Sequence, residues 1–152
     1  MKSNVSYREY EEKDFADLVA MMACLYEEDP EGEAISDDKI RKTVGEYFTN
    51  PEKLRIVMIC ADGAAIGYSL LVFFWSNEYG GDILHIDELY ITKEYRNNRV
   101  ASDFIGHLPE IYKNAVAVAV EVTPSNSAAA GLYERLGFEP SPNRHLLLHP
   151  VR

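Results

Sequence analysis

The sequence lacks the features that staple a very small fold or place a chain in a membrane. It has only two cysteines among 152 residues, Cys24 and Cys60, and they lie far apart within apolar runs. This spacing excludes a disulfide framework or a cysteine metal site and favours reduced thiols in the cytoplasm. No apolar run approaches the roughly 20 residues of a membrane-spanning helix, and residues 1–10 lack the apolar stretch of a secretory signal. We therefore predict a cytoplasmic protein with no membrane partner.

Positive charge is also scarce. The chain carries 15 Lys and Arg against 25 Asp and Glu, a net charge of −10. Non-specific binding to nucleic acid requires a basic face, so we expect no nucleic-acid partner. The acids are concentrated: residues 9–38 carry −11 and the other 122 residues carry +1. Most of these acids are expected on solvated faces, but some of them would attract a cationic partner or substrate.

Length and composition predict one globular domain over residues 1–152. Apolar residues make up 47% and charged residues 26%, as in ordinary globular proteins. A chain of this length buries enough surface to fold without a metal or a disulfide. No repeat, low-complexity tract or linker divides it.

Hydrophobic periodicity and turn signals predict an α/β fold, a mixed sheet with helices on both faces. The predicted strands are 5–9, 54–60, 65–75, 83–91, 115–122 and a hairpin-like pair within 138–149; the predicted helices are 14–26, 36–50, 102–112 and 126–136. The element order is therefore β-α-α-β-β-β-α-β-α-β-β. Asp62-Gly63 predicts a hairpin turn, Ser36 a helix cap and Gly137 a left-handed helix end. Pro109 should kink or end the third helix.

The segment between the strand 83–91 and the following helix is basic, unlike most of the chain. It carries Lys93, Arg96 and Arg99 around a turn that leads into a helix. A helix N-terminus presents unpaired N–H groups and a positive dipole end, and both favour phosphate oxygens. These residues alone support a phosphate site and a solvated basic loop about equally.

Two motifs in this part of the chain resemble the GCN5-related N-acetyltransferase (GNAT) family, nearest to its small-amine, polyamine and aminoglycoside subgroup. The first is the strand Asp87-Glu88-Leu89-Tyr90-Ile91, followed by the loop Arg96, Asn97, Asn98, Arg99, Val100 and Ala101. The second is Asn126, followed by Tyr133 and the ending Leu136-Gly137-Phe138. The resemblance covers nearly the whole chain. It implies a central, mostly antiparallel twisted sheet, acetyl-CoA as co-substrate, and loop amides that hold the CoA pyrophosphate.

The loop departs from the family pattern at the fourth place, where Arg99 stands instead of the usual glycine. Glycine allows close approach of the backbone to the pyrophosphate. Asn97 replaces another frequent glycine, although asparagine tolerates left-handed geometry. Arg99 either adds a charge contact to a CoA phosphate or crowds the site. We favour retained cofactor binding.

The resemblance also assigns roles in acetyl transfer. Tyr133 is expected to protonate the leaving thiolate, and Asn126 to lie near the pantetheine arm or to cap the last long helix. Glu88 is the preferred base and Asp87 its rival, because alternation along a strand lets only one of them face a given pocket. Backbone groups at Leu89, Tyr90 and Ile91 are expected to contact the cofactor and the oxyanion.

The acceptor predicted from the resemblance is a small molecule with a cationic primary amine. The expected substrate-binding carboxylates are Glu27, Glu28, Asp29 and Glu78. The four histidines show no ligand spacing, so we expect no metal. A non-catalytic acyl-CoA-binding regulatory module and a protein or peptide N-acetyltransferase are the alternatives. Members of this family often form homodimers, and we expect a homodimer here.

Overall fold

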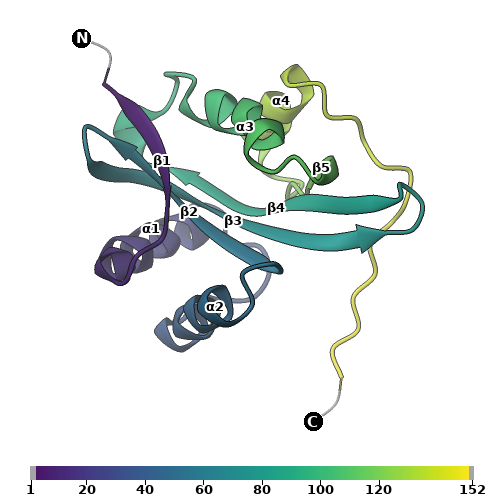
Figure 1. Cartoon of the computed structure of the whole chain (residues 1–152), viewed down its shortest axis with the longest axis horizontal. Helices are drawn as coiled ribbons and strands as arrows, with labels where there is room; N and C mark the ends of the chain where they lie inside the picture. The colour runs from purple at the N-terminus through teal and green to yellow at the C-terminus, as the bar shows by residue number, and fades with distance from the viewer. Residues whose placement is uncertain (1–2, 151–152) are drawn as a thin grey trace.

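The computed structural model describes residues 3–150; residues 1–2 and 151–152 of the expected domain lie outside the described part. Five strands form one sheet in the order β1-β2-β3-β4-β5: Val5–Glu9, Leu54–Ala61, Ala64–Ser76, Gly81–Ile91 and Ala115–Val120. The first three pairings are antiparallel, and β4 pairs with β5 in parallel. The mixed α/β fold predicted from the sequence is therefore confirmed (Figure 1).

Helices cover both faces of the sheet. The helices α1 (Phe15–Glu28) and α2 (Asp37–Thr49) lie on one side, and α3 (Val100–Ile111) and α4 (Ser127–Arg135) lie on the other (Figure 1). Each side has its own core, because a β-strand sends successive side chains to opposite faces. Met58 and Tyr68 are fully buried on the α1/α2 side, and Ile59 and Phe104 on the α3/α4 side.

Local signals place several element ends where the sequence predicts them. Ser36 caps α2, since its Oγ accepts a hydrogen bond of 3.2 Å from the backbone N–H of Lys39. Asp62 and Gly63 both have positive φ between β2 and β3, as a tight hairpin requires. Gly137 follows α4 with a φ of 93°. The helix α1, however, runs on to Glu28, two residues beyond the end predicted at residue 26.

The strand β4 is irregular in its second half. Its register with β3 shifts so that Leu70 pairs with Glu88 and Leu71 with Ile86, leaving Asp87 as the extra residue of a β-bulge. Close strand contact continues beyond the bulge. A Cβ at Gly67 would overlap the backbone oxygen of Tyr90, so this position requires glycine.

One prediction about the C-terminal half is wrong, and one of two alternatives expected for Pro109 does not occur. Residues 139–150 form no strand, and the hairpin-like pair expected within 138–149 is absent from the described residues. Pro140 and Pro142 lack the N–H donors of a ladder, and Leu146, Leu147 and Leu148 are exposed. Pro109 does not end α3, which continues to Ile111. It lies so close to the C-terminus of the helix that few hydrogen bonds are affected.

Candidate active site

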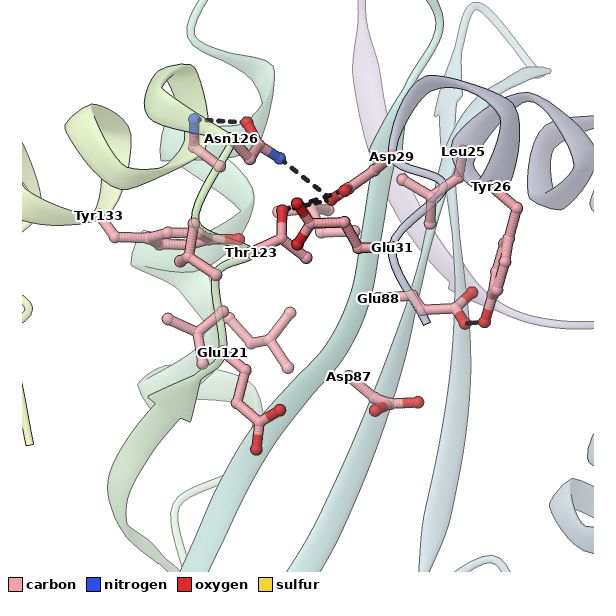
Figure 2. A pocket seen from close by; sticks show the side chains of 15 residues that line it. Leu25, Tyr26, Asp29, Glu31, Asp87, Glu88, Glu121, Thr123, Asn126 and Tyr133 are labelled. Carbon is pink, nitrogen blue, oxygen red and sulfur yellow. Dashed lines mark hydrogen bonds between the residues drawn. The ribbon is translucent and has the colours of Figure 1, made fainter. Parts of the chain in front are cut away.

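A cavity of about 420 Å³ opens where β4 and β5 separate. The parallel pairing ends at Ile86 and Val120, and beyond this point the two strands diverge. The walls come from α1 and the loop after it, from the ends of β4 and β5, and from α4 (Figure 2). Crevices at the carboxyl ends of diverging parallel strands are common ligand sites.

Asp87 and Glu88 both line this cavity. Strict alternation would send one of them to each face of the sheet, and the prediction that only one can face a given pocket is wrong. The bulge at Asp87 explains the difference, because an inserted residue interrupts the alternation of side chains along the strand.

The Glu88 carboxylate is held by two tyrosines. Tyr26 of α1 donates a hydrogen bond to Oε2 at 2.6 Å, and Tyr68 of β3 donates to Oε1 at 2.7 Å. Burial raises the pKa of Glu88 above its ordinary value, and the two tyrosine hydrogen bonds oppose that rise. Figure 2 shows Glu88 turned toward Tyr26.

Asp87 has a different environment. The residue is more exposed than Glu88, and the tyrosine hydrogen bonds found in residues 3–150 at this site go to Glu88. Burial of the carboxyl group on the cavity side raises the pKa of Asp87, and the negative charge of Glu121 adds to the rise, while His85 opposes it. Glu121 follows β5 and lines the same cavity. The cavity therefore concentrates negative charge.

Tyr133 of α4 enters the cavity from the side opposite Glu88 (Figure 2). It is 9% exposed, and its ring packs edge-on against Phe138 at 5.3 Å between centroids. Burial raises the pKa of the Tyr133 phenol, so the hydroxyl keeps its proton at neutral pH. A protonated phenol beside a cavity is a proton donor.

The acidic segment after α1 is tied to the loop that follows β5. Thr123 Oγ1 donates to the Asp29 carboxylate at 3.0 and 3.1 Å, and Ser125 Oγ donates to Glu31 Oε1 at 3.0 Å. Asn126 Nδ2 lies 3.5 Å from Asp29 Oδ2. The Asn126 Oδ1 atom accepts from the Ala129 N–H at 3.1 Å, so Asn126 caps α4.

Two residues of the basic loop between β4 and α3 have a left-handed backbone. They stand at the positions where the resemblance expects glycine. Asn97 has a φ of 62° and Arg99 a φ of 63°, and Arg99 is the N-cap residue of α3. No side chain caps this helix. Its first amides therefore have no side-chain acceptor, as an anion site requires.

Arg96 anchors the basic loop and meets an acidic residue of α1. Its Nε donates to the Ile91 carbonyl at 2.8 Å, and its guanidinium lies 5.3 Å from the centre of the Tyr90 ring. Its Nη2 donates to Glu28 Oε2 at 2.7 Å. Lys93 Nζ lies 3.9 Å from Glu28 Oε1. Glu28 thus contacts the predicted cofactor cations.

The structure brings some of the predicted residues together and separates others. The cavity collects Asp29, Asp87, Glu88, Leu89, Asn126 and Tyr133. Tyr90, Ile91 and the loop 96–101 lie beside it, along the end of β4 and the start of α3. Glu27 and Glu78 are exposed and do not line the cavity, and Glu78 lies in the turn between β3 and β4.

Sequence reasoning missed further residues at the site. Tyr26 and Tyr68 bind Glu88, while Glu31 and Glu121 extend the acidic lining. Tyr26 lies at helical spacing from apolar residues of α1, and Tyr68 lies in an apolar strand, so neither carries a signal of its own in the sequence. Glu31 lies within the acidic window of the sequence.

No group of three or more His, Cys, Asp or Glu in residues 3–150 is arranged to hold a metal ion. No helix of the described part is long and apolar enough to cross a membrane.

Comparison with known proteins supports the same fold and family. The model of the acetyltransferase (GNAT) family matches residues 15–138. No curated protein matches the chain in sequence.

Solved structures are similar over nearly the whole chain. A possible acetyltransferase from Clostridium difficile 630 has 20% sequence identity and a TM-score of 0.84, covering 97% of this chain and 99% of its own. The aminoglycoside N-acetyltransferase AAC(6')-Iy in complex with CoA has 18% identity and a TM-score of 0.75, covering 100% and 97%. The integron cassette protein HFX_CASS3 from the Cole Harbour Salt Marsh metagenome has 26% identity and a TM-score of 0.74, covering 96% and 90%.

At these identities the first two similarities concern the fold. The matched family model spans most of the chain, which therefore belongs to the acetyltransferase (GNAT) family and is an N-acetyltransferase by class.

Proposed function

We propose that this protein transfers the acetyl group of acetyl-CoA to a primary amine of a small cationic acceptor. The observation that carries the proposal is the cavity between β4 and β5. It is lined by carboxylates on one side and by the protonated phenol of Tyr133 on the other. Carboxylates attract and orient an ammonium group, and a phenol is a suitable donor to a leaving thiolate.

The cofactor site in this proposal is the loop 96–101 with the start of α3. The uncapped amides and the side chains of Lys93, Arg96 and Arg99 supply positive charge for the CoA phosphates. The left-handed φ at Asn97 and Arg99 supports this assignment, because the loop has the turn that glycine gives in the resembling proteins. The proposal assigns the pantetheine arm to Asn126 and to the segment Leu89-Tyr90-Ile91; Leu89 and Asn126 also line the cavity.

The reaction begins when the acceptor loses a proton. A free alkylamine has a pKa of about 10.4, so it is cationic at neutral pH and cannot attack. Glu88, directly or through a water, takes the proton, and the amine nitrogen forms a bond to the thioester carbonyl carbon. A backbone N–H of the 89–91 segment stabilises the oxyanion. The C–S bond then breaks, and Tyr133 gives its proton to the thiolate. The nitrogen of the new amide loses its second proton, which restores the phenol of Tyr133, and the proton held by Glu88 passes to solvent.

The two carboxylates of the bulge have separate roles in this scheme. Glu88 is the base, and Asp87, beside Glu121, binds the cationic part of the acceptor. The proposal expects Glu88→Gln to lower kcat more than Asp87→Asn does. If the two roles were exchanged, Asp87→Asn would cause the larger loss. Asp29 contributes to acceptor binding, while Glu27 and Glu78 are weaker candidates because they lie outside the cavity.

The test is acetyl-CoA turnover on a panel of polyamines, diamines, aminoglycosides, amino acids and peptides, together with calorimetry of CoA binding. We expect CoA binding and turnover of at least one small amine. Binding without turnover on the whole panel would favour a regulatory module, and turnover restricted to peptides would favour a peptide acetyltransferase. Tyr133→Phe should lower kcat while leaving CoA affinity nearly unchanged.

We further propose that the single domain forms a homodimer in the cytoplasm. Support for the dimer comes from the exposed Leu146, Leu147 and Leu148, which are 81%, 73% and 86% accessible, and from β5 at the edge of the sheet. Free thiols at Cys24 and Cys60 fit a reducing compartment. Light scattering should give twice the chain mass, and replacing the three leucines with lysine should give the monomer. A monomeric wild type would contradict the proposal.

A further inference from the structure

Two tyrosines donate hydrogen bonds to the Glu88 carboxylate, more than a partly buried base needs to be satisfied. The two donors come from different elements, Tyr26 from α1 and Tyr68 from β3, and each takes one oxygen of the carboxylate. Ser69 Oγ also donates to the Glu88 carbonyl at 2.8 Å, which fixes the backbone beside the bulge. Side chain and backbone of Glu88 are thus held from two sides.

The two hydrogen bonds have the lengths of charge-assisted bonds. O–H donors to a carboxylate lie at about 2.5–2.7 Å, shorter than neutral pairs. Both tyrosines act as donors. Burial, and then the neighbouring Glu88 carboxylate, raises the pKa of Tyr26 and of Tyr68, so both phenols remain protonated. Glu88 therefore receives two donors at every pH at which the protein is folded and the carboxylate is ionised.

Each carboxylate oxygen can accept about two hydrogen bonds. One position on each oxygen is filled by a tyrosine, so the remaining positions are the ones open to an acceptor amine in the cavity. Tyr68 is fully buried, and Tyr26 lines the cavity wall. A carboxylate with one tyrosine hydrogen bond on each oxygen cannot rotate without breaking a short hydrogen bond.

Resting on the proposed function, we infer that Tyr26 and Tyr68 are positioning residues that clamp the Glu88 carboxylate in the orientation that receives the proton of the acceptor amine. Tyr68 is fully buried and Tyr26 forms part of the cavity wall, and in this scheme both act on the reaction through Glu88. Asp87, which has no such clamp, remains free to adapt to the shape of the acceptor.

The clamp predicts the direction of a pH effect. Donors to the ionised form lower the pKa of a carboxyl group, so removing one raises it. Other titratable groups also face the site: Asp87 on β4, Asp29 and Glu31 on the loop after α1, Glu121 after β5, and Tyr133 on α4. These groups are unchanged in a tyrosine-to-phenylalanine variant, so a shift common to Tyr26→Phe and Tyr68→Phe reports on Glu88.

The experiment combines kinetics with a titration that needs no turnover. The pKa of Glu88 is read from carbon-13 NMR of the labelled carboxyl groups, with Glu88→Gln identifying the signal. We expect Tyr26→Phe and Tyr68→Phe each to raise it by about one pH unit, the effect of losing one hydrogen bond to a charged group. The acidic limb of the kcat/KM profile should move upward by the same amount, with kcat lowered about tenfold.

Tyr47→Phe is the matched control. Tyr47 also donates to a glutamate, to Glu9 Oε2 at 2.9 Å, but it lies on α2 away from the cavity. This variant should change neither the pH profile nor the Glu88 titration. In a Glu88→Gln background, Tyr26→Phe should cause no further loss of kcat, because its effect passes through Glu88.

The outcomes separate the clamp from the proposed function. An unchanged pKa of Glu88 in a folded Tyr26→Phe protein would overturn the inference, even if Tyr68→Phe fails to fold. A raised pKa in a protein whose wild type acetylates no amine would retain the clamp and reject the proposed function. If the tyrosine-to-phenylalanine changes lower kcat by the same factor in the wild type and in the Glu88→Gln background, the two tyrosines have a structural role. That result would overturn the positioning role.

Discussion

The helices α3 and α4 both begin where a strand of the parallel pair ends, yet their N-termini are built differently. Asn126 caps α4 with a 3.1 Å hydrogen bond from its side chain, whereas no side chain caps α3. The residue that precedes α3 is Arg99, in a left-handed conformation that costs a non-glycine residue about 1–2 kcal/mol. The N-terminus of α4 is closed by a side-chain cap, whereas α3 begins with a strained residue and no side chain accepts from its first amides. The difference suggests that stability is given up at the proposed phosphate site.

Reversing charge at the uncapped end should have the largest effect. Arg96→Glu removes a cation beside the proposed pyrophosphate site and places an acid next to Glu28. We expect CoA affinity to fall by about 100-fold, since losing a hydrogen bond to a charged group costs about 1.5–3 kcal/mol. Calorimetry measures the loss.

The control for this variant is Arg135→Glu, which makes the same change of charge at the end of α4. It should leave CoA affinity within about twofold. Arg96→Lys should fall between the two, because lysine keeps the charge but lacks the planar fork of arginine. Similar losses for Arg96→Glu and Arg135→Glu would show that total charge, and not the α3 terminus, governs binding.

Removing the cap of α4 tests the other side of the comparison. Asn126→Ala should lower the free energy of unfolding by about 1 kcal/mol, the usual cost of a lost cap. Denaturant unfolding measures it, and Ser36→Ala at the cap of α2 should give a similar loss. Only Asn126→Ala should also weaken CoA binding, if Asn126 lies beside the pantetheine arm. Equal CoA affinities in the two variants would leave Asn126 with the capping role alone.

Relieving the strain at α3 should give a smaller effect of opposite sign. Arg99→Gly places a residue that tolerates positive φ at the N-cap, so we expect the free energy of unfolding to rise by about 0.5–1 kcal/mol. CoA affinity should fall a few fold, because a cation is lost. A variant that gains stability and also binds CoA more tightly would mean that Arg99 crowds the cofactor.

The sequence predicted the fold better than the site, for reasons that particular residues make clear. Ser36, Asp62-Gly63 and Gly137 act locally, so their effects on helix and strand ends could be predicted from neighbours in sequence. The loop 96–101 and Tyr133 carried recognisable motifs. The bulge at Asp87 could not be predicted, because it depends on how β3 and β4 pair. The same holds for Tyr26 and Glu28, whose partners Glu88 and Arg96 lie more than 60 residues away in sequence.

The contact between Glu28 and Arg96 links the acidic and basic sides of the site, and breaking it should have the smallest effect. Both side chains are about one-third exposed, at 31% and 37%, and such partly exposed ion pairs contribute about 0–1 kcal/mol. In the proposed cofactor site, Glu28 would compete with a CoA phosphate for the same guanidinium, so Glu28→Gln should tighten CoA binding by up to about fivefold. Calorimetry at low and high salt measures the change, and Glu27→Gln, an exposed neighbour one residue away, controls for the loss of one negative charge.

The gain should shrink at high salt, because screening weakens the ion pair that competes with the phosphate. If both variants tighten binding equally, Glu28 acts through the general acidity of α1, and its 2.7 Å contact with Arg96 does not gate the cofactor site.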